Sequence, residues 1–298
     1  MVEPGLLAGR AAVVVGGSRG IGREVSALLA SHGAGVVVNG RDSDAAEESA
    51  SAIARDGGRA LAYAGSPADE ATASALIGSC VDAFGRIDVL INCAGIAGRH
   101  NSSILDVTTA EFGEFLDSHL WTVFQTCRAA APLMVDQGGG AIVNTSSFAF
   151  LGDYGGTGYP AGKGAINAFT MAIAGQLKPH GVRANVVCPG AKTRLSTGRE
   201  YEAHIDDLHR RGLLDDGSKA VALDAPPPEY AAPIYAYLAS EMAAGITGEI
   251  FVAAGGYVGR FKRPGQALIG YRDHTGSPPW SIDEIHQMLA KEMHTHGQ

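Results

Sequence analysis

The sequence predicts an α/β fold in which a doubly wound parallel sheet carries helices on both faces. Apolar runs of strand length alternate with Ala-rich segments of helical period, and a Gly-rich turn joins the first run to the first helical segment. Strands and helices in regular alternation give parallel strands joined by right-handed crossovers. With 298 residues, of which 46% are hydrophobic, the chain is long enough to bury the core of such a domain.

The expected elements follow one another without an internal repeat. Seven strands are expected, at residues 11–15, 35–38, 60–64, 89–91, 141–144, 183–187 and 249–252. Helices are expected at residues 21–31, 43–55, 70–84, 111–134, 159–177 and 230–238. Together they place residues 1–258 in a single domain. The polar segment 195–228, which ends in three consecutive prolines, is expected to be a long irregular insertion of the kind that forms a lid or binding segment.

Composition and charge exclude several classes of protein. The formal net charge is −8 and Lys and Arg form no cluster, so neither nucleic acid nor an anionic membrane is expected as a partner. The four cysteines, Cys80, Cys93, Cys127 and Cys188, are too scattered for a zinc site or a disulfide framework, and no metal is predicted. The chain opens without a signal-peptide pattern and has no apolar run of about 18 residues, which predicts a cytoplasmic protein.

The first expected strand leads through a Gly-rich turn, Val-Gly-Gly-Ser-Arg-Gly-Ile-Gly, into the first helix. Glycines in such a turn allow the backbone to approach a pyrophosphate, and the helix N-terminus offers free N–H groups to it. Because the turn lies between a strand and a helix, it is a stronger signal than the glycine pattern alone. The sequence therefore predicts a dinucleotide site at Gly16, Ser18, Arg19, Gly20, Ile21 and Gly22.

The end of the second strand favours NADP(H) over NAD(H). An acidic residue there would bind the ribose 2′-hydroxyl of NAD, but Gly40 stands at that position and Arg41 follows it. Arg19 in the Gly-rich turn is a second guanidinium for a 2′-phosphate. The alternative is that both arginines are surface charges, and Asp42 could partly neutralise Arg41.

Tyr159 and Lys163 stand four residues apart after a Gly-rich stretch. If a helix begins near Tyr159, the phenol and the ammonium lie on one face, one turn apart. A nearby cation favours the phenolate and lowers the phenol pKa from its usual value of about 10, so that Tyr159 can exchange a proton with an alcohol or carbonyl oxygen.

With these pieces the chain resembles the short-chain dehydrogenase/reductase family over about residues 9–256. Five ordered motifs carry the resemblance: the Gly-rich turn, Asn92 to Gly95, Ser146-Ser147, Tyr159 with Lys163, and Pro189-Gly190 with Thr193. The resemblance implies a seven-stranded Rossmann fold and NAD(P)-dependent oxidoreduction of a small-molecule carbonyl or secondary alcohol. It also implies cofactor contacts at Asn92, Ala94, Gly95, Pro189, Gly190 and Thr193, besides Tyr159 and Lys163.

The family's catalytic roles map onto three residues. Tyr159 matches the acid–base, Lys163 the residue that binds the nicotinamide ribose and lowers the phenol pKa, and Ser147 the serine that hydrogen-bonds the substrate carbonyl. The chain departs from the family in the distance from Ser147 to Tyr159, which is one residue shorter than the common spacing. Either the intervening loop is trimmed or Ser146 takes part.

Two further positions depart from the family. His119 stands where an asparagine usually holds a relay water through its backbone; we expect a neutral His119 that serves the relay, or else a side chain that only packs. Ser66 stands where many members have an aspartate that contacts adenine. These departures leave open an alternative, a nucleotide-binding regulator or scaffold with reduced catalysis.

Residues 259–298 extend the chain beyond the usual end of the family. Ser281 and Glu284 form a capping-box pattern before an apolar stripe, and the extension is expected to pack on the body or a neighbouring subunit. The last strand and the tail resemble members that act on 3-hydroxyacyl-CoA (or 3-oxoacyl) thioesters or steroid-like substrates. Candidate cations for CoA are Lys192, Arg194, Arg199, Arg210, Arg211, Arg260, Lys262 and Arg263. The family resemblance implies a homotetramer or a homodimer.

Overall fold

The structure is a computed structural model that describes residues 5–96, 103–152, 156–194, 196–263 and 265–295. It divides into two compact units, Met1–Phe261 and Lys262–Gln298. We call the first unit the body and the second the tail. Leu195, at the start of the expected lid, and residues 264 and 296–298 of the expected extension lie outside the described residues.

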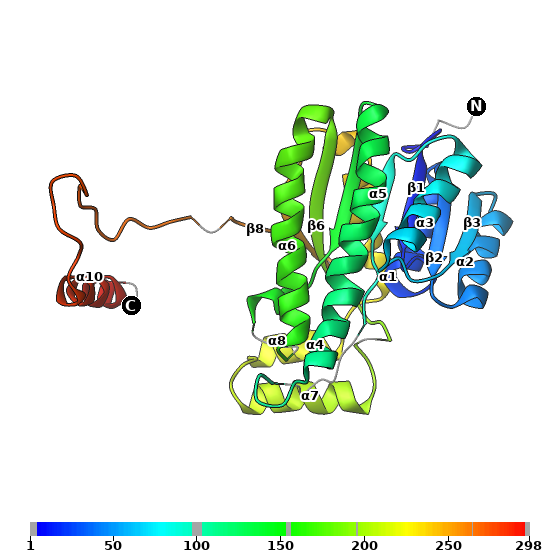
Figure 1. Cartoon of the computed structure of the whole chain (residues 1–298). Coiled ribbons are helices and arrows are strands. Elements are labelled where there is room, and N and C mark those ends of the chain that lie inside the picture. Colours follow the sequence, from blue (N-terminus) through cyan, green and yellow to red (C-terminus); the bar gives the residue numbers. More distant parts are fainter. Residues whose placement is uncertain (1–4, 97–102, 153–155, 195, 264, 296–298) are drawn as a thin grey trace. The chain divides into compact units, whose positions relative to one another are not determined.

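The body is built on the expected doubly wound sheet (Figure 1). The strands, in spatial order, are β3 (Arg59–Ala64), β2 (Gly35–Gly40), β1 (Ala11–Val15), β4 (Val89–Asn92), β5 (Gly140–Thr145), β6 (Val182–Gly190), β7 (Ile250–Ala254) and β8 (Tyr257–Phe261). The first seven are parallel, as expected. The chain order reverses between β1 and β4, so the carboxyl ends of these strands flank the crevice where doubly wound folds bind ligands.

An eighth strand corrects the expectation of seven. β8 pairs antiparallel with β7, with Ala254 opposite Tyr257. Only Gly255 and Gly256 separate these partners, and Gly255 has a φ of +55°. A two-residue Gly-Gly connection is a strong hairpin signal, but no strand was expected after residue 252, and the end of β8 falls in the expected extension, which begins at residue 259.

Helices cover both faces of the sheet (Figure 1). One core cluster packs α1 (Gly20–Ser31), α2 (Ser43–Arg55) and α9 (Ala232–Ala239) against the sheet. The other packs α3 (Glu70–Phe84), α5 (Thr122–Asp136) and α6 (Gly158–Leu177) against it. Among the described residues no helix combines the length and apolarity needed to span a bilayer.

The expected helix 111–134 is divided into three parts. α4 (Thr109–Leu116) begins at a capping box made by Thr108 and Glu111. A π-helical turn, η1 (Asp117–Trp121), then widens the helix before α5. A π-helical turn inserts about one residue into an α-helix and often marks a functional site, and this one carries His119.

The lid is helical, which corrects the expectation of an irregular insertion. It contains α7 (Arg199–Arg210) and α8 (Asp216–Leu223), and Asp215 caps α8 by accepting a hydrogen bond from the Ser218 amide. α7 buries His204, Ile205 and Leu208, a narrow stripe within a strongly polar sequence. That polar excess concealed the helical period. We keep the name lid for residues 196–228.

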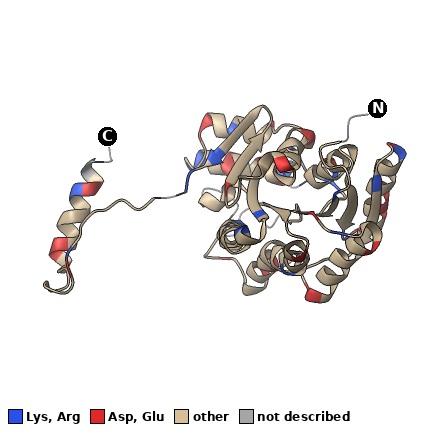
Figure 2. Ribbon diagram, turned by 90° about the horizontal axis from the view of Figure 1, so that it is seen from above, with Lys and Arg blue, Asp and Glu red and all other residues tan. Residues whose placement is uncertain are grey.

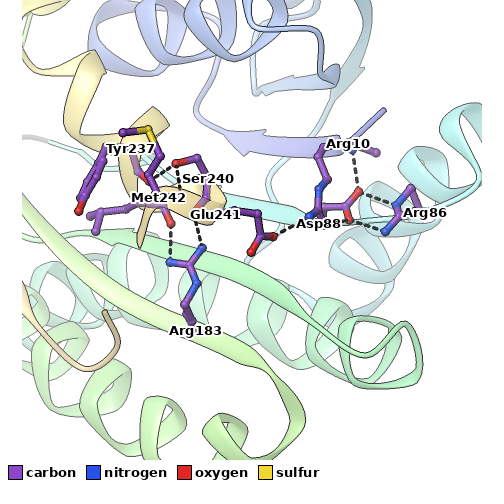
Figure 3. Close-up of polar contacts among 10 residues, drawn as sticks. Arg10, Arg86, Asp88, Arg183, Tyr237, Ser240, Glu241 and Met242 are labelled. Atoms are coloured by element: carbon purple, nitrogen blue, oxygen red, sulfur yellow. Dashed lines mark hydrogen bonds and ion pairs between the residues drawn. The ribbon is translucent and has the colours of Figure 1, made fainter. Parts of the chain in front are cut away.

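Charged residues of both signs are interspersed around the body (Figure 2). At the amino edge of the sheet they form a network around Asp88 (Figure 3). The buried Asp88 carboxylate accepts hydrogen bonds from Arg10, from Arg86 and from the Ala11 amide, all at 2.7–2.9 Å. Arg10 also pairs with Glu241 at 2.6 Å. Beside this network, Arg183 donates to the carbonyl oxygens of Leu238 and Ser240 at the end of α9.

The tail contains α10 (Ile282–Thr295). The expected capping box is present: the Ser281 amide donates to the Glu284 carboxylate at 2.8 Å, and the Glu284 amide donates to the Ser281 hydroxyl at 3.2 Å. Arg272 pairs with Glu284 and lies 3.7 Å from the centre of the Trp280 ring. These contacts hold the start of α10 against the segment that precedes it.

Candidate active site

The Gly-rich turn forms a cradle at the carboxyl edge of the sheet. Gly16 has a φ of +74°, and a Cβ at this position would lie 2.7 Å from the Ala94 nitrogen. A Cβ on Gly22 would lie 2.1 Å from the Gly16 oxygen. The side chain of the N-cap residue Arg19 makes no capping hydrogen bond to α1. The backbone is therefore open to an anion where the sequence predicts the pyrophosphate, and these residues fit a dinucleotide.

The end of β6 meets this cradle. Gly20 has a φ of +53°, and a Cβ there would lie 3.5 Å from the Thr193 methyl group. Pro189 and Gly190 end β6, where they pair with Ala253 and Ala254 of β7. The structure thus brings Thr193, predicted from the family motif, beside the Gly-rich turn. Phosphates bound by the turn would lie next to it.

The residues predicted for the adenosine end lie at the carboxyl end of β2. A Cβ on Gly40 would lie only 2.4 Å from the Ser18 hydroxyl oxygen, so Ser18 fills the space that a side chain at position 40 would need. Arg41 is exposed, and so is Ser66 after β3. Asp42 pairs with Arg19 at 2.6 Å, which corrects the interpretation that it neutralises Arg41. Asp42 also caps α2, and its bond from the Ala45 amide, above all, lowers its pKa.

Lys163 is buried beneath Tyr159 in the first turns of α6. Its side chain is 3% exposed, and Nζ donates a hydrogen bond to the Thr145 carbonyl at 3.1 Å. Nζ lies 5.6 Å from the centre of the Tyr159 ring. Burial lowers the pKa of Lys163 to about 8, because the charged form has lost its water. Thr145 was missed by the sequence analysis, although its place immediately before the serine pair was a usable signal.

The two serines after β5 have different partners. The Ser146 hydroxyl donates to the Lys163 carbonyl at 3.0 Å and so anchors α6 to the strand end. Ser147 accepts a hydrogen bond from the Ala149 amide at 3.2 Å and begins the 3-10 turn η2 (Phe148–Leu151). Ser146 has the structural position, which leaves Ser147 as the candidate for substrate contact.

His119 is enclosed between two glycines. Its ring lies 5.2 Å from the Tyr159 ring, edge to face. A Cβ on Gly95 would lie 2.8 Å from the imidazole Cε1, and a Cβ on Gly162 would lie 3.3 Å from the His119 Cβ. Only glycine at position 95 therefore leaves room for this imidazole.

The hydrogen bonds of His119 assign its tautomer. Nε2 lies 3.2 Å from the Ile96 carbonyl oxygen, which can only accept, so Nε2 carries the hydrogen. Nδ1 is then an acceptor, and it is buried without a partner among the described residues. Burial, and secondarily the charge of Lys163, lowers the pKa of His119 to about 2. The imidazole is therefore neutral at neutral pH.

Asn92 lies at the centre of a buried polar chain. Its amide group donates to the Asn144 oxygen at 2.9 Å, and its oxygen accepts from the Thr126 hydroxyl at 2.9 Å. Asn144 in turn donates to Thr170 of α6 at 2.9 Å. The Asn92 side chain thus ties β4 to β5, α5 and α6, rather than reaching toward the cradle. Thr126, Asn144 and Thr170 were missed because each reads as an ordinary core position.

Comparison of the chain with known protein families and solved structures agrees with this geometry. A family model described as "short chain dehydrogenase" matches residues 10–202. The chain belongs to the short-chain dehydrogenase/reductase family. It is therefore an oxidoreductase that acts on CH–OH or C=O groups of small molecules with a nicotinamide cofactor. The alternative of a non-catalytic scaffold gains no support from the named relatives.

Relatives at similar distance carry names that refer to different substrates. The chain is 32% identical to a 3alpha-hydroxysteroid dehydrogenase of Mediterraneibacter gnavus, over 84% of this chain and 97% of the relative. It is 34% identical to a hydroxyacyl-CoA dehydrogenase of Mycobacterium tuberculosis, over 84% of this chain and 78% of the relative. A crystal structure of a short chain dehydrogenase from Mycobacterium avium superposes with a TM-score of 0.79 at 31% identity, covering 96% of this chain and 95% of that one.

Proposed function

We propose that the protein is an NADP(H)-dependent oxidoreductase that interconverts a carbonyl compound and a secondary alcohol in the cytoplasm. The observation that carries the proposal is the buried ammonium of Lys163 beneath the Tyr159 ring, beside a backbone cradle for a pyrophosphate. All four cysteines are thiols, which fits a reducing compartment.

In the proposed mechanism the side chains orient the substrate and move one proton. Bound NADPH supplies the hydride, or NADP⁺ accepts it in the reverse direction. The Ser147 hydroxyl donates to the substrate oxygen, and Tyr159 gives its phenolic proton to that oxygen as negative charge develops. The Lys163 ammonium stabilises the resulting phenolate. Lys163 can stay charged there because Thr145 accepts one of its hydrogen bonds.

We include His119 among the proposed catalytic residues because its Nδ1 can accept a hydrogen bond from a water. Its Nδ1 lies 3.2 Å from the Cβ position of Gly95, and Lys163 Nζ lies 3.7 Å from that same position. Both atoms therefore lie near Gly95, and the proposal is that a water donating to Nδ1 connects His119 with Lys163. With a pKa of about 2 the imidazole cannot act as an acid, so its proposed role is to hold such a water for proton relay.

The preference for NADP(H) rests on the β2 end. Because Ser18 fills the space above Gly40, the site lacks the carboxylate that would bind a ribose 2′-hydroxyl, and Arg19 and Arg41 stand nearby. Asp42 holds Arg19, so a 2′-phosphate would have to compete with this carboxylate. Asp42→Asn should therefore raise the ratio of kcat/KM for NADPH to that for NADH, whereas no change in this ratio would place the phosphate elsewhere.

We further propose a homodimer or homotetramer. A row of aromatic side chains runs from the half-exposed Trp121 to Phe124, at 5.4 Å between ring centres, and on to Phe169 of α6, at 6.1 Å. Exposed Trp is common in subunit contacts. Light scattering coupled to size-exclusion chromatography measures the assembly, and a monomer at micromolar concentration would refute it.

Turnover tests the function. Purified protein is mixed with a panel of ketones and NADPH or NADH, and nicotinamide absorbance is followed. Wild type should oxidise NADPH, and Tyr159→Phe should lose about 100-fold or more in kcat because the proton donor is gone. Equal rates for the two proteins would remove the assignment of Tyr159.

A further inference from the structure

The lid is acidic, and most of its cations are already paired. It contains seven acidic and four basic residues, a formal charge of −3. Asp207 pairs with Arg210 at 2.7 Å and with Arg211 at 3.4 Å, and Asp206 pairs with Lys219 at 2.8 Å. Arg199, at the start of α7, is the remaining basic residue of the lid. The lid thus offers an excess of carboxylates to a ligand that lies along it.

The other candidate cations for CoA are not residues of the lid. Arg260 of β8 pairs with Glu249 at 3.4 Å. Lys192 and Arg194 precede the lid and flank Thr193, whose methyl group lies beside the Gly-rich turn. Lys262 and Arg263 belong to the tail. The described residues of the lid therefore offer no group of unpaired cations that could bind the phosphates of CoA.

Large apolar side chains are exposed in the segments that leave the carboxyl edge. Leu213, Val221 and Leu223 of the lid follow β6, Leu151 follows β5, and Ile104 and Leu105 follow β4. Figure 1 shows α4, α7 and α8 at one end of the body. Carboxyl ends of parallel strands meet at one edge, so these three segments all begin at the edge where doubly wound folds bind their ligands. Exposed apolar side chains on three segments that leave this edge favour an apolar ligand there.

We infer that the substrate is an uncharged ketone or secondary alcohol with an apolar body, and not an acyl group on a polyanionic carrier such as CoA. An acyl chain would enter the crevice while the carrier's phosphates stayed outside, against the lid. There they would meet a surplus of carboxylates within the roughly 10 Å over which charges act at 0.1 M salt. The inference rests on the proposed function and names the substrate class for the same site.

A matched pair of substrates tests this inference. Acetoacetyl-CoA and the acetoacetyl thioester of N-acetylcysteamine present the same reacting ketone, but only the first carries phosphates. With NADPH and the full chain we expect kcat/KM to be at least about tenfold higher for the uncharged thioester, and higher salt should narrow this ratio. An apolar cyclic ketone serves as a third substrate and should also be reduced. A kcat/KM for the CoA ester equal to or above that of the uncharged thioester would overturn the inference.

A lid variant and a distant control assign the effect to the lid. Asp207→Asn releases Arg210 and Arg211 and should raise kcat/KM for the CoA ester severalfold, with the value for the uncharged thioester changed by less than about twofold. Asp136→Asn makes the same charge change at the exposed end of α5, four residues before β5 begins at the opposite edge, and should leave both values unchanged. Equal effects of the two substitutions would also refute the inference. If no substrate is reduced faster than by Tyr159→Phe, the proposed function itself has failed.

Discussion

Two buried ionisable side chains lie at opposite edges of the same sheet and differ in their partners. Asp88, at the amino edge, is 2% exposed and is bonded by two guanidinium groups and a backbone amide (Figure 3). Lys163, at the carboxyl edge, is 3% exposed and donates to one carbonyl oxygen, while the described residues around it show no carboxylate paired with it.

Their pKa values record this difference. Burial alone would raise the pKa of Asp88, but hydrogen bonds from Arg86, the Ala11 amide and Arg10 outweigh it and lower the pKa. Burial lowers the pKa of Lys163 because little compensates for its lost water. The amino edge uses its buried charge for stability. The carboxyl edge keeps a buried charge at a cost in stability, which is the expected signature of a functional group.

The largest effect should follow from removing the carboxyl-edge charge. Lys163→Met keeps the side-chain volume, so we expect kcat/KM to fall by about 10²–10⁴ because the phenolate of Tyr159 loses its stabilising cation. Stability of the cofactor-free protein at neutral pH should be equal or higher, because a buried charge is gone. Steady-state kinetics and urea unfolding measure the two quantities. Lys178→Met, at the exposed end of α6, is the control; a comparable loss of activity there would end the comparison.

Removing the charge of Asp88 at the amino edge should lower stability and leave activity unchanged. Asp88→Asn removes the carboxylate that Arg10 and Arg86 share, and we expect a loss of about 2 kcal/mol in the free energy of unfolding. Activity per folded molecule should not change. Glu241→Gln removes the exposed partner of Arg10 in the same network and should cost less than about 1 kcal/mol. If Asp88→Asn lowers kcat instead of stability, the two edges are not separate in function.

The two edges should also respond to pH in separate windows. The folded pKa of Asp88 is depressed, so its contribution is present above the unfolded pKa of about 4 and is lost as pH falls through the folded value. For Lys163, with a folded pKa of about 8, the unfolded chain binds more protons above that pH, so stability should rise by on the order of 1 kcal/mol from pH 8 to pH 9. Urea titrations of wild type and Lys163→Met measure this; parallel curves for the two proteins would contradict it.

The smallest effect is expected at His119. His119→Asn should retain kcat/KM within about tenfold, because a neutral side chain that only holds a water can be replaced by another polar one. The dependence of kcat/KM on pH should be the same for the variant and the wild type between pH 5 and 8, because the pKa of His119 is about 2. A loss of about 100-fold or more would show that the imidazole itself has a catalytic role.

Much of the fold was predictable because its signals are local. The strand–helix alternation and the Gly-rich turn fixed the parallel sheet and its ligand edge. β8 was missed because the expected sheet ended at residue 252 and the Gly-Gly turn after it was not recognised as a hairpin. The lid helices were missed because the narrow apolar stripe of α7 lies within a polar sequence.

The parts of the site that belong to sequence motifs could be predicted, whereas the roles that depend on side-chain packing could not. Tyr159 and Lys163 lie as their spacing predicts, in the first turns of one helix. The roles of neighbouring groups depend on contacts that cannot be read from a sequence. Examples are the hydrogen bond from Ser146 to the Lys163 carbonyl, the ion pair of Asp42 with Arg19, and the hydrogen bond from Asn92 to Asn144. The proposed roles of Ser147, His119 and the cofactor contacts stay predictions until turnover is measured.

The π-helical turn η1 makes the alignment of two helices depend on a single residue. Each residue of an α-helix advances the chain by about 100° and 1.5 Å. Deleting one residue between Asp117 and Trp121 would let an unbroken α-helix form, and everything ahead of the deletion, including α4, would turn by about that angle relative to α5. The deletion would make the helix regular, but it would also change the direction of the side chain at position 119. The π-helical turn should therefore be kept in any engineered form of the enzyme.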